Sequence, residues 1–215
     1  MRFVFDHLAL VAANLDAGAS WVRGRLGVDM NVGGAHPKMG THNRLTRTGP
    51  DNFLEIIAID PEQADPGRAR WYRMDDPAVH EMTKTAPRPL SWIVATDDLD
   101  AVLGVARDLG LDLGEAVQVS RGDLTWRITV RDDGDLPEGG TLPVFIQWPD
   151  GPHPATRMPD LGLTISKLIL RHPELDRLDR LLSALGVRDM VELEDGRAGI
   201  AAEISRSDGA AVLID

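Results

Sequence analysis

The sequence predicts an α+β fold built from repeated βαβββ modules, two of which form an open, cup-shaped mixed sheet. A strand, a helix and three further strands are indicated over residues 1–61, and the same order recurs over residues 90–150. A third, smaller βαβββ-like module is indicated over residues 161–215. The intervening residues 62–89 are rich in proline and charge, which is typical of a linker or of a lid over a binding site.

The first module begins with an apolar, strand-like run from Phe3 to Ala12. Apolar residues then recur at helical spacing up to Leu26, between Asn14, a good N-cap residue, and Gly27, a residue typical just beyond a helix. Further strands are expected near Asp29–Val32, Thr41–Thr48 and Phe53–Ile59.

The second module repeats these signals, and the third repeats them in a shorter form. A strand over 91–96 precedes a helical stripe that ends at Gly110, and further strands are expected over 116–120, 125–130 and 144–148. In the third module a strand over 163–170 precedes Pro173, which the first turn of a helix tolerates, and a leucine stripe that ends before Gly186. Short strands are expected near 190–193, 198–205 and 210–214.

Composition excludes several classes of function. The chain of 215 residues carries a formal net charge of −11 and has a sequence pI near 4.9, so no basic stripe exists to neutralise nucleic acid. It contains no cysteine, which excludes disulfides, thiolate metal sites and a cysteine nucleophile. No apolar run approaches the roughly 20 residues of a membrane helix, and no signal-peptide pattern precedes the first strand. We therefore expect a soluble cytoplasmic protein without a membrane partner.

Two residues of metal-ligand type interrupt apolar, strand-like runs. His7 is expected on the strand face that also carries Phe3 and Phe5, and Glu55 lies within the run 53–59. A buried carboxylate is costly unless it is paired, protonated or bound to a cation. If the two strands are neighbours, His7 and Glu55 would form half of a divalent-metal site, and imidazole with carboxylate suits Zn, Fe, Mn or Ni. The alternative is that His7 is a core histidine satisfied by a backbone carbonyl.

These residues belong to a set of short motifs, which are Asp6-His7-Leu8, Gly40-Thr41-His42-Asn43, Leu54-Glu55-Ile56-Ile57 and Asp60-Pro61. In combination they resemble the vicinal oxygen chelate superfamily, and in particular its glyoxalase-like domains, over residues 1–150. The resemblance implies that two modules curl into a cup around metal and substrate, each usually giving one metal ligand from its first strand and one from its last. His7 and Glu55 take those positions in the first module. In the second module Ser91 aligns with His7, and Gln147 is left as a weaker oxygen ligand.

His42, Asn43 and two tryptophans are further candidates for binding a substrate. Strand alternation sends His42 and Asn43 to opposite faces. Asn43 would hydrogen-bond a substrate if it points into the cup, and His42 would instead supply a third metal ligand; a solvated strand face explains the same residues without function. Trp126 and Trp148 suit either the core or the wall of a pocket for an apolar or aromatic ligand.

The resemblance implies a small-molecule lyase, isomerase or dioxygenase-type enzyme, in which a divalent metal polarises the substrate and Glu55 is the candidate catalytic base. The missing ligands of the second module support an alternative, a metal-free protein of the same fold that binds or sequesters a small molecule. A third alternative is an assembly module whose cup is vestigial. Because three modules leave one without a partner, we also expect a homodimer.

Overall fold

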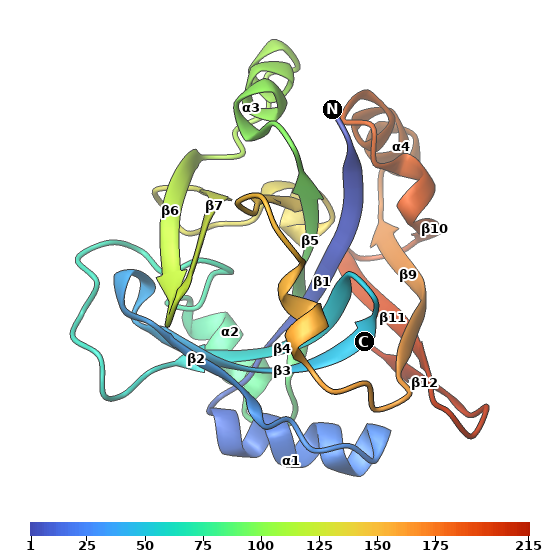
Figure 1. Ribbon diagram of the computed structural model, residues 1–215. Helices are drawn as coiled ribbons and strands as arrows, with labels where there is room; N and C mark the ends of the chain where they lie inside the picture. Colours follow the sequence, from blue (N-terminus) through green and yellow to red (C-terminus); the bar gives the residue numbers. More distant parts are fainter.

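The computed structural model describes residues 1–215 and confirms the α+β fold, with one large curved sheet and a second, smaller sheet (Figure 1). The large sheet curves around a central space, and the amino-terminal strand runs through its middle. None of the helices combines the length and the apolar character needed to cross a membrane.

The first module forms one half of the large sheet. Its elements are β1 (Phe3–Val11), α1 (Leu15–Leu26), β2 (Val32–His36), the 3-10 helix η1 (Pro37–Met39), β3 (Thr41–Gly49) and β4 (Asn52–Ile59). β1 pairs in parallel with β4, which continues through antiparallel pairs into β3 and β2. The side chain of Asn14 caps α1 by accepting a hydrogen bond from the Ala17 N–H at 2.8 Å, and Gly27 ends the helix at φ 74°.

The second module repeats this arrangement. Its elements are β5 (Arg88–Thr96), α3 (Leu99–Asp108), β6 (Glu115–Arg121), β7 (Leu124–Val130), η2 (Pro137–Gly140) and β8 (Val144–Gln147). β5 pairs in parallel with β8, which leads through antiparallel pairs to β7 and β6. Asp98 caps α3 by accepting from the Ala101 N–H at 3.0 Å.

The two modules join where β1 and β5 pair antiparallel, which gives the strand order β2-β3-β4-β1-β5-β8-β7-β6. The sheet curves so strongly that its two edge strands approach each other, and the side chain of Arg121 in β6 lies over Gly34 in β2. This closure converts an open sheet into a cup, whose inner face is lined by a core of 17 buried residues.

The third module packs against the outer face of the large sheet, which is the face turned away from the cup. Its elements are β9 (Thr164–His172), α4 (Leu175–Ala184), η4 (Arg188–Met190), β10 (Glu192–Asp195), β11 (Gly199–Ser205) and β12 (Ala211–Ile214), and its strands form the sheet β10-β9-β11-β12. Leu170 and Leu178 share one core of 28 buried residues with Leu8 and Leu10 from the outer face of β1. The third module thus has an apolar partner within its own chain, and the homodimer stays a prediction.

Two long connections contribute to the interior of the cup. The first joins β4 to β5, contains α2 (Pro77–Thr83) and buries Trp71 and Tyr72 against the inner core. The second joins β8 to β9, contains η3 (Pro154–Arg157) and passes in front of the cup in Figure 1. Residues from both connections therefore take part in the site described next.

Candidate active site

Asp6 and His7 are neighbours in β1, and both reach the interior of the cup because the strand carries a β-bulge. The register of β1 against β5 shifts between Phe5 and His7, which leaves Asp6 as an extra residue. Beyond the bulge His7 lies on the cup face, whereas Phe3 and Phe5 pack against the outer core. The expectation that Phe3 and Phe5 share a face with His7 is therefore wrong, because one extra residue reverses strand alternation.

His7 lies between two buried carboxylates. Its Nδ1 is 2.5 Å from Oδ1 of Asp6, and its Nε2 is 3.5 Å from Oε2 of Glu55. All three residues are buried: the exposed fraction is 0% for Asp6, 5% for His7 and 4% for Glu55. Phe53 stacks on the imidazole with the two ring centres 4.4 Å apart. The neighbouring strands β1 and β4 thus hold a buried row of carboxylate, imidazole and carboxylate, which we call the Asp6–His7–Glu55 row.

Charge compensation sets the protonation of this row. Burial alone would lower the pKa of His7, but hydrogen bonds to Asp6 and Glu55 and their negative charges raise it to about 9. Burial likewise opposes ionisation of Asp6, yet hydrogen bonds with His153 and His7 lower its pKa to about 2. The pKa of Glu55 is also lowered, because its contacts with His7 outweigh its burial. At neutral pH both carboxylates are ionised and His7 is an imidazolium.

Asn43 holds Glu55 from the neighbouring strand. Its Nδ2 donates to Oε1 of Glu55 at 2.6 Å and lies 3.3 Å from Nε2 of His36, while its Oδ1 accepts from the Gly34 N–H at 3.1 Å. Because both amide protons of Asn43 are then used, we assign the proton of His36 to Nδ1, which lies 3.1 Å from Oγ1 of Thr41. Burial lowers the pKa of His36 to about 4, so this second imidazole is neutral.

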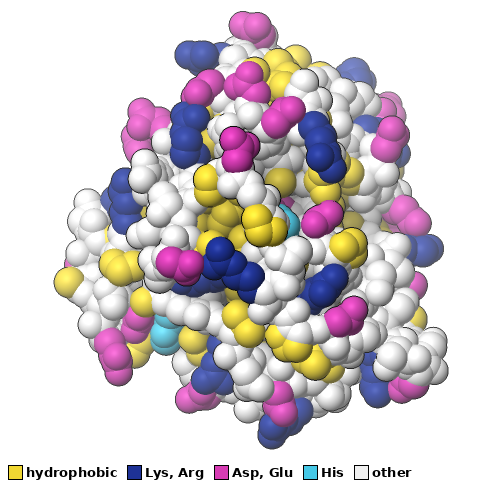
Figure 2. All heavy atoms as spheres, viewed as in Figure 1, with side chains coloured by type: hydrophobic (Ala, Val, Ile, Leu, Met, Phe, Trp, Pro, Cys, Tyr) yellow, Lys and Arg dark blue, Asp and Glu magenta, His cyan; other side chains and the backbone are white.

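Asp6 also ties the second connection to the site. Its Oδ2 accepts a hydrogen bond from Nε1 of Trp148 at 2.7 Å and lies 3.0 Å from Nε2 of His153. One buried carboxylate thereby orients His7 through one oxygen and anchors the start of the β8–β9 connection through the other. In the surface view, hydrophobic side chains gather at the centre of this face with a histidine among them (Figure 2).

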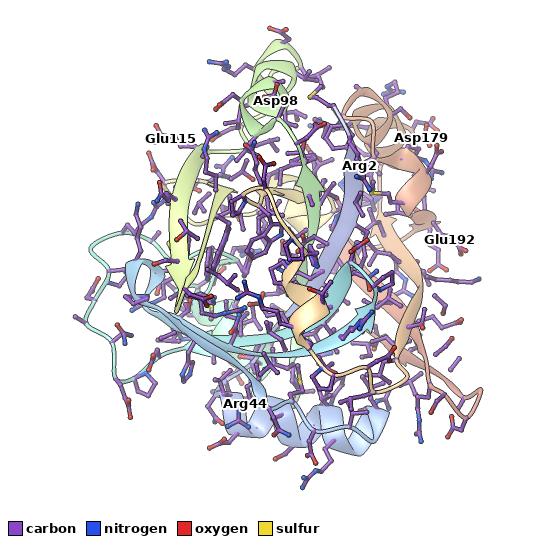
Figure 3. The ribbon with its side chains drawn as sticks, viewed as in Figure 1. Arg2, Arg44, Asp98, Glu115, Asp179 and Glu192 are labelled. Carbon is purple, nitrogen blue, oxygen red and sulfur yellow. The ribbon has the colours of Figure 1, made fainter.

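A small cavity lies beside the Asp6–His7–Glu55 row. It measures about 20 Å³, which is room for about one water molecule. Aromatic side chains enclose it: Trp71 and Tyr72 stack with ring centres 5.4 Å apart, and Trp126 and Trp148 meet at 5.1 Å. Figure 3 shows how densely side chains fill the interior of the cup. The lining residues are His7, His36, Asn43, Phe53, Glu55, Trp71, Tyr72, Arg121, Trp126, Ile128, Ile146 and Trp148.

Five of the residues that sequence analysis singled out line this cavity together, namely His7, Asn43, Glu55, Trp126 and Trp148. Gln147 does not join them. Alternation along β8 turns it to the outer face, where its Oε1 accepts from the Leu99 N–H at 3.3 Å at the start of α3. Gln147 therefore cannot complete a metal site with His7 and Glu55.

His42 also lies outside the cup. It is on the outer face of β3, and its Nδ1 is 3.7 Å from Oδ1 of Asp60. Arg44, two residues further along the same face, reaches Asp16 of α1 at 2.6 Å and is visible beside that helix in Figure 3. Since alternation sends Asn43 inward, it sends His42 away from any substrate in the cup, so His42 serves neither as a substrate contact there nor as a third ligand.

Asp6, His36 and Arg121 are among the site residues that sequence analysis did not single out. Asp6 stands inside a recognised motif, but only the bulge turns it inward. His36 follows a glycine-rich stretch without a clear strand pattern, and Arg121 comes from the opposite edge of the sheet. No local signal marks His36 or Arg121, because pairing of β2 with β3 places His36 beside Asn43 and closure of the cup brings Arg121 there.

The donor set fits half of a metal site. The 3.5 Å between His7 Nε2 and Glu55 Oε2 suits two ligands that each bind one divalent ion at about 2.1 Å, and Asp6 behind His7 is the kind of carboxylate that orients a ligating histidine. No group of three or more His, Cys, Asp or Glu side chains is arranged so that it could hold a metal ion. On the second-module side the cup presents Ser91 and Ile146 instead of ligands. The residues present therefore do not complete a resident metal site.

Paired βαβββ modules that close into a cup, with polar side chains buried at its centre, define the class of the vicinal oxygen chelate superfamily. A family model described as a glyoxalase-like domain matches residues 5–186. The chain belongs to this glyoxalase-like domain family.

Two kinds of solved structure resemble the fold. A hypothetical protein from Staphylococcus aureus is 16% identical with a TM-score of 0.70, over 100% of this chain and 99% of that one. Methylmalonyl-CoA epimerase from Mycobacterium tuberculosis is 20% identical with a TM-score of 0.46, over 68% of this chain and 88% of its own. A variant of the Streptomyces coelicolor epimerase in complex with 2-nitronate-propionyl-CoA is 18% identical with a TM-score of 0.43, over 68% and 97%. No functionally curated protein matches the sequence. The first likeness shows the fold over the full chain.

Proposed function

We propose that this protein is a small-molecule enzyme of the isomerase or lyase type, in which Glu55 takes a proton from a carbon next to a carbonyl group. The observation that carries the proposal is the buried Asp6–His7–Glu55 row, which keeps an ionised carboxylate beside an imidazolium at the wall of a cavity. Glutamate is a common general base, and exclusion of water strengthens its electrostatic interactions with reacting groups.

The chemistry follows from the positions of the charges. Glu55 accepts the proton, and the electron pair of the C–H bond moves to the carbonyl oxygen as an enolate. The Nε2–H of His7 supplies positive charge close to this developing oxyanion, and Asp6 keeps His7 protonated. Return of the proton to the same or a neighbouring carbon gives an isomerase, and loss of a leaving group gives a lyase. Because the cavity measures only about 20 Å³, a substrate larger than water enters only when lining side chains move aside.

The proposal is tested by exchange of α-protons for deuterium in a panel of ketones, keto acids and their amides, followed by NMR. We expect catalysed exchange by the wild type and a decrease of about 10²–10⁴-fold in Glu55→Gln, the usual contribution of a general base. Glu62→Gln changes an exposed carboxylate and is the matched control. Absence of exchange over the whole panel, or equal exchange by Glu55→Gln, would contradict the assignment of Glu55.

A second candidate function uses a divalent cation, Zn, Fe, Mn or Ni, held by His7 and Glu55 and completed by substrate oxygens. The 3.5 Å separation of the two donor atoms favours it, and it keeps the dioxygenase-type reaction among the candidates. Elemental analysis of the tag-free protein decides: near-stoichiometric metal that disappears in both His7→Ala and Glu55→Ala supports the cation.

A metal-free binding protein is a further alternative, and the aromatic enclosure of the cavity favours it. It predicts ligand binding that survives Glu55→Gln without proton exchange by any variant. The proposal also includes a cytoplasmic homodimer, whose oligomeric state sedimentation velocity measures directly.

A further inference from the structure

Arg121 points its guanidinium at the cavity without forming an ion pair. It lies at the end of β6, lines the cavity and donates from Nη1 to Oδ1 of Asn43 at 3.3 Å, a neutral acceptor. The two carboxylates whose charge acts on Arg121 are Glu55 and Asp123, and these are engaged by His7 and Arg157. A guanidinium has five N–H donors, so most of the hydrogen-bonding capacity of Arg121 is free for a ligand.

Two further donors stand unpaired around the same cavity. Trp71 and Trp126 are both at least 94% buried. The Nε1 atom of each indole has no hydrogen-bond partner. Both residues also line the cavity, where each forms a T-shaped pair with His36 at ring-centre distances of 5.2 and 5.8 Å. Buried N–H groups normally have acceptors, so these two indoles point to a ligand that supplies one.

The backbone of β2 is shaped to receive Arg121. A Cβ at Gly34 would lie 3.0 Å from Cγ and 3.3 Å from Cδ of Arg121, closer than side chains normally approach. The arginine stem therefore lies directly over the glycine, and the approach of the two sheet edges sets the position of the guanidinium. Gly34→Ala would therefore shift the stem of Arg121 by a few tenths of an ångström without removing its charge.

We propose that the substrate of the site carries a carboxylate, bound by Arg121 with the indole N–H of Trp126, and a planar apolar body that lies among the aromatic side chains. The inference deepens the proposed function by naming its substrate class. Arginine binds carboxylates through two parallel N–H donors, and the indole supplies a third donor to the same oxygens. The nearby negative charge of Glu55 favours a single carboxylate over a more highly charged group such as a phosphate.

The test is isothermal titration of benzoate, phenylacetate and propanoate, each against its neutral amide. We expect the wild type to bind at least one acid at least tenfold more tightly than its amide. Arg121→Gln should lose this preference, Arg121→Lys should keep part of it, and Gly34→Ala should weaken it by displacing the guanidinium. Arg127→Gln removes an arginine that is paired with Asp100 on the outer face and is the matched control. Thermal unfolding confirms that each variant is folded.

Binding of acid and amide with equal affinity, binding of no acid, or a preference unchanged in Arg121→Gln would overturn the inference. Glu55→Gln separates it from the proposed function. Acid binding retained or strengthened in Glu55→Gln, with Arg121 still required, supports the carboxylate site even if no variant exchanges protons. Loss of proton exchange in Glu55→Gln without any dependence of binding on Arg121 supports the base and overturns the carboxylate site.

Discussion

Oδ1 of Asp6 and Nδ1 of His7 lie 2.5 Å apart, although the two residues are neighbours in one strand. Adjacent residues of a regular strand point to opposite faces, so this contact exists only because the bulge inserts an extra residue at Asp6. The bulge gives the cup a second buried carboxylate in addition to Glu55. Asp6 thereby becomes a positioning residue that holds the ring of His7 and its proton.

We expect Asp6→Asn to lower the pKa of His7, because the substitution removes one of the two negative charges that stabilise the imidazolium. It should also lower the free energy of unfolding by about 3–5 kcal/mol, the usual cost of removing one partner of a buried ion pair. NMR titration of the imidazole nitrogens and urea denaturation measure the two effects. Asp97→Asn, at an exposed carboxylate that accepts from the Arg2 N–H at 2.9 Å, is the control. An unchanged pKa of His7 in Asp6→Asn would show that Asp6 does not set its protonation.

Two buried histidines predict a bell-shaped dependence of stability on pH. The pKa of His7 is raised from 6.5 to about 9, so the folded state keeps a proton that the unfolded state loses, and stability falls as the pH rises from 6.5 towards 9. The pKa of His36 is lowered from 6.5 to about 4, so between these pH values the unfolded state binds a proton at this histidine and the folded state does not. Stability therefore falls again as the pH drops from 6.5 towards 4.

Urea denaturation between pH 4.5 and 9 measures this curve, whose maximum should lie near pH 6.5. His36→Gln should flatten the acidic limb and leave the alkaline limb unchanged, and His7→Gln should do the reverse. Both limbs surviving in both variants would assign the pH dependence to other groups.

The order of the elements could be predicted because each element carries its own local signal. Asn14 and Gly27 bracket α1 as cap residues. The leucine stripe of the third module becomes α4 between Leu175 and Ala184. These signals depend on neighbours in sequence, which a single chain displays in full.

The site could be predicted only where strand alternation is regular. Because side chains alternate between the two faces along β8 and into Trp148, only one of Gln147 and Trp148 can point into the cup. In the structure this residue is Trp148. Asp6 escaped prediction because a bulge changes the alternation of β1. Arg121 could not be predicted as a site residue because its distance from Asn43 depends on how strongly the eight-stranded sheet curves. That curvature is a property of the assembled fold.

The packing of α1 predicts opposite effects for two glycines of one helix. A Cβ at Gly18 would lie 2.4 Å from Cγ2 of Ile56 on β4, so Gly18→Ala should push the helix off the sheet and destabilise the fold by about 1–3 kcal/mol. A Cβ at Gly24 meets nothing within 4 Å, so Gly24→Ala should stabilise the helix by about 0.5–1 kcal/mol. Urea denaturation of both variants makes the comparison, and effects of the same sign would contradict the packing of α1 on β4.

Removal of residues 161–215 should prevent the rest of the chain from folding, although the first two modules contain the whole large sheet. Leu8 and Leu10 on the outer face of β1 are buried in the same core as Leu170 and Leu178 of the third module. Each buried leucine contributes about 1.5–3 kcal/mol, so exposing several of them removes stability comparable to the 5–15 kcal/mol typical of a whole domain. We expect residues 1–160 to lack a cooperative thermal transition in circular dichroism and to bind a hydrophobic dye. A cooperative transition at the temperature of the full chain would instead show that the third module is an independent domain and that the two cores are separable.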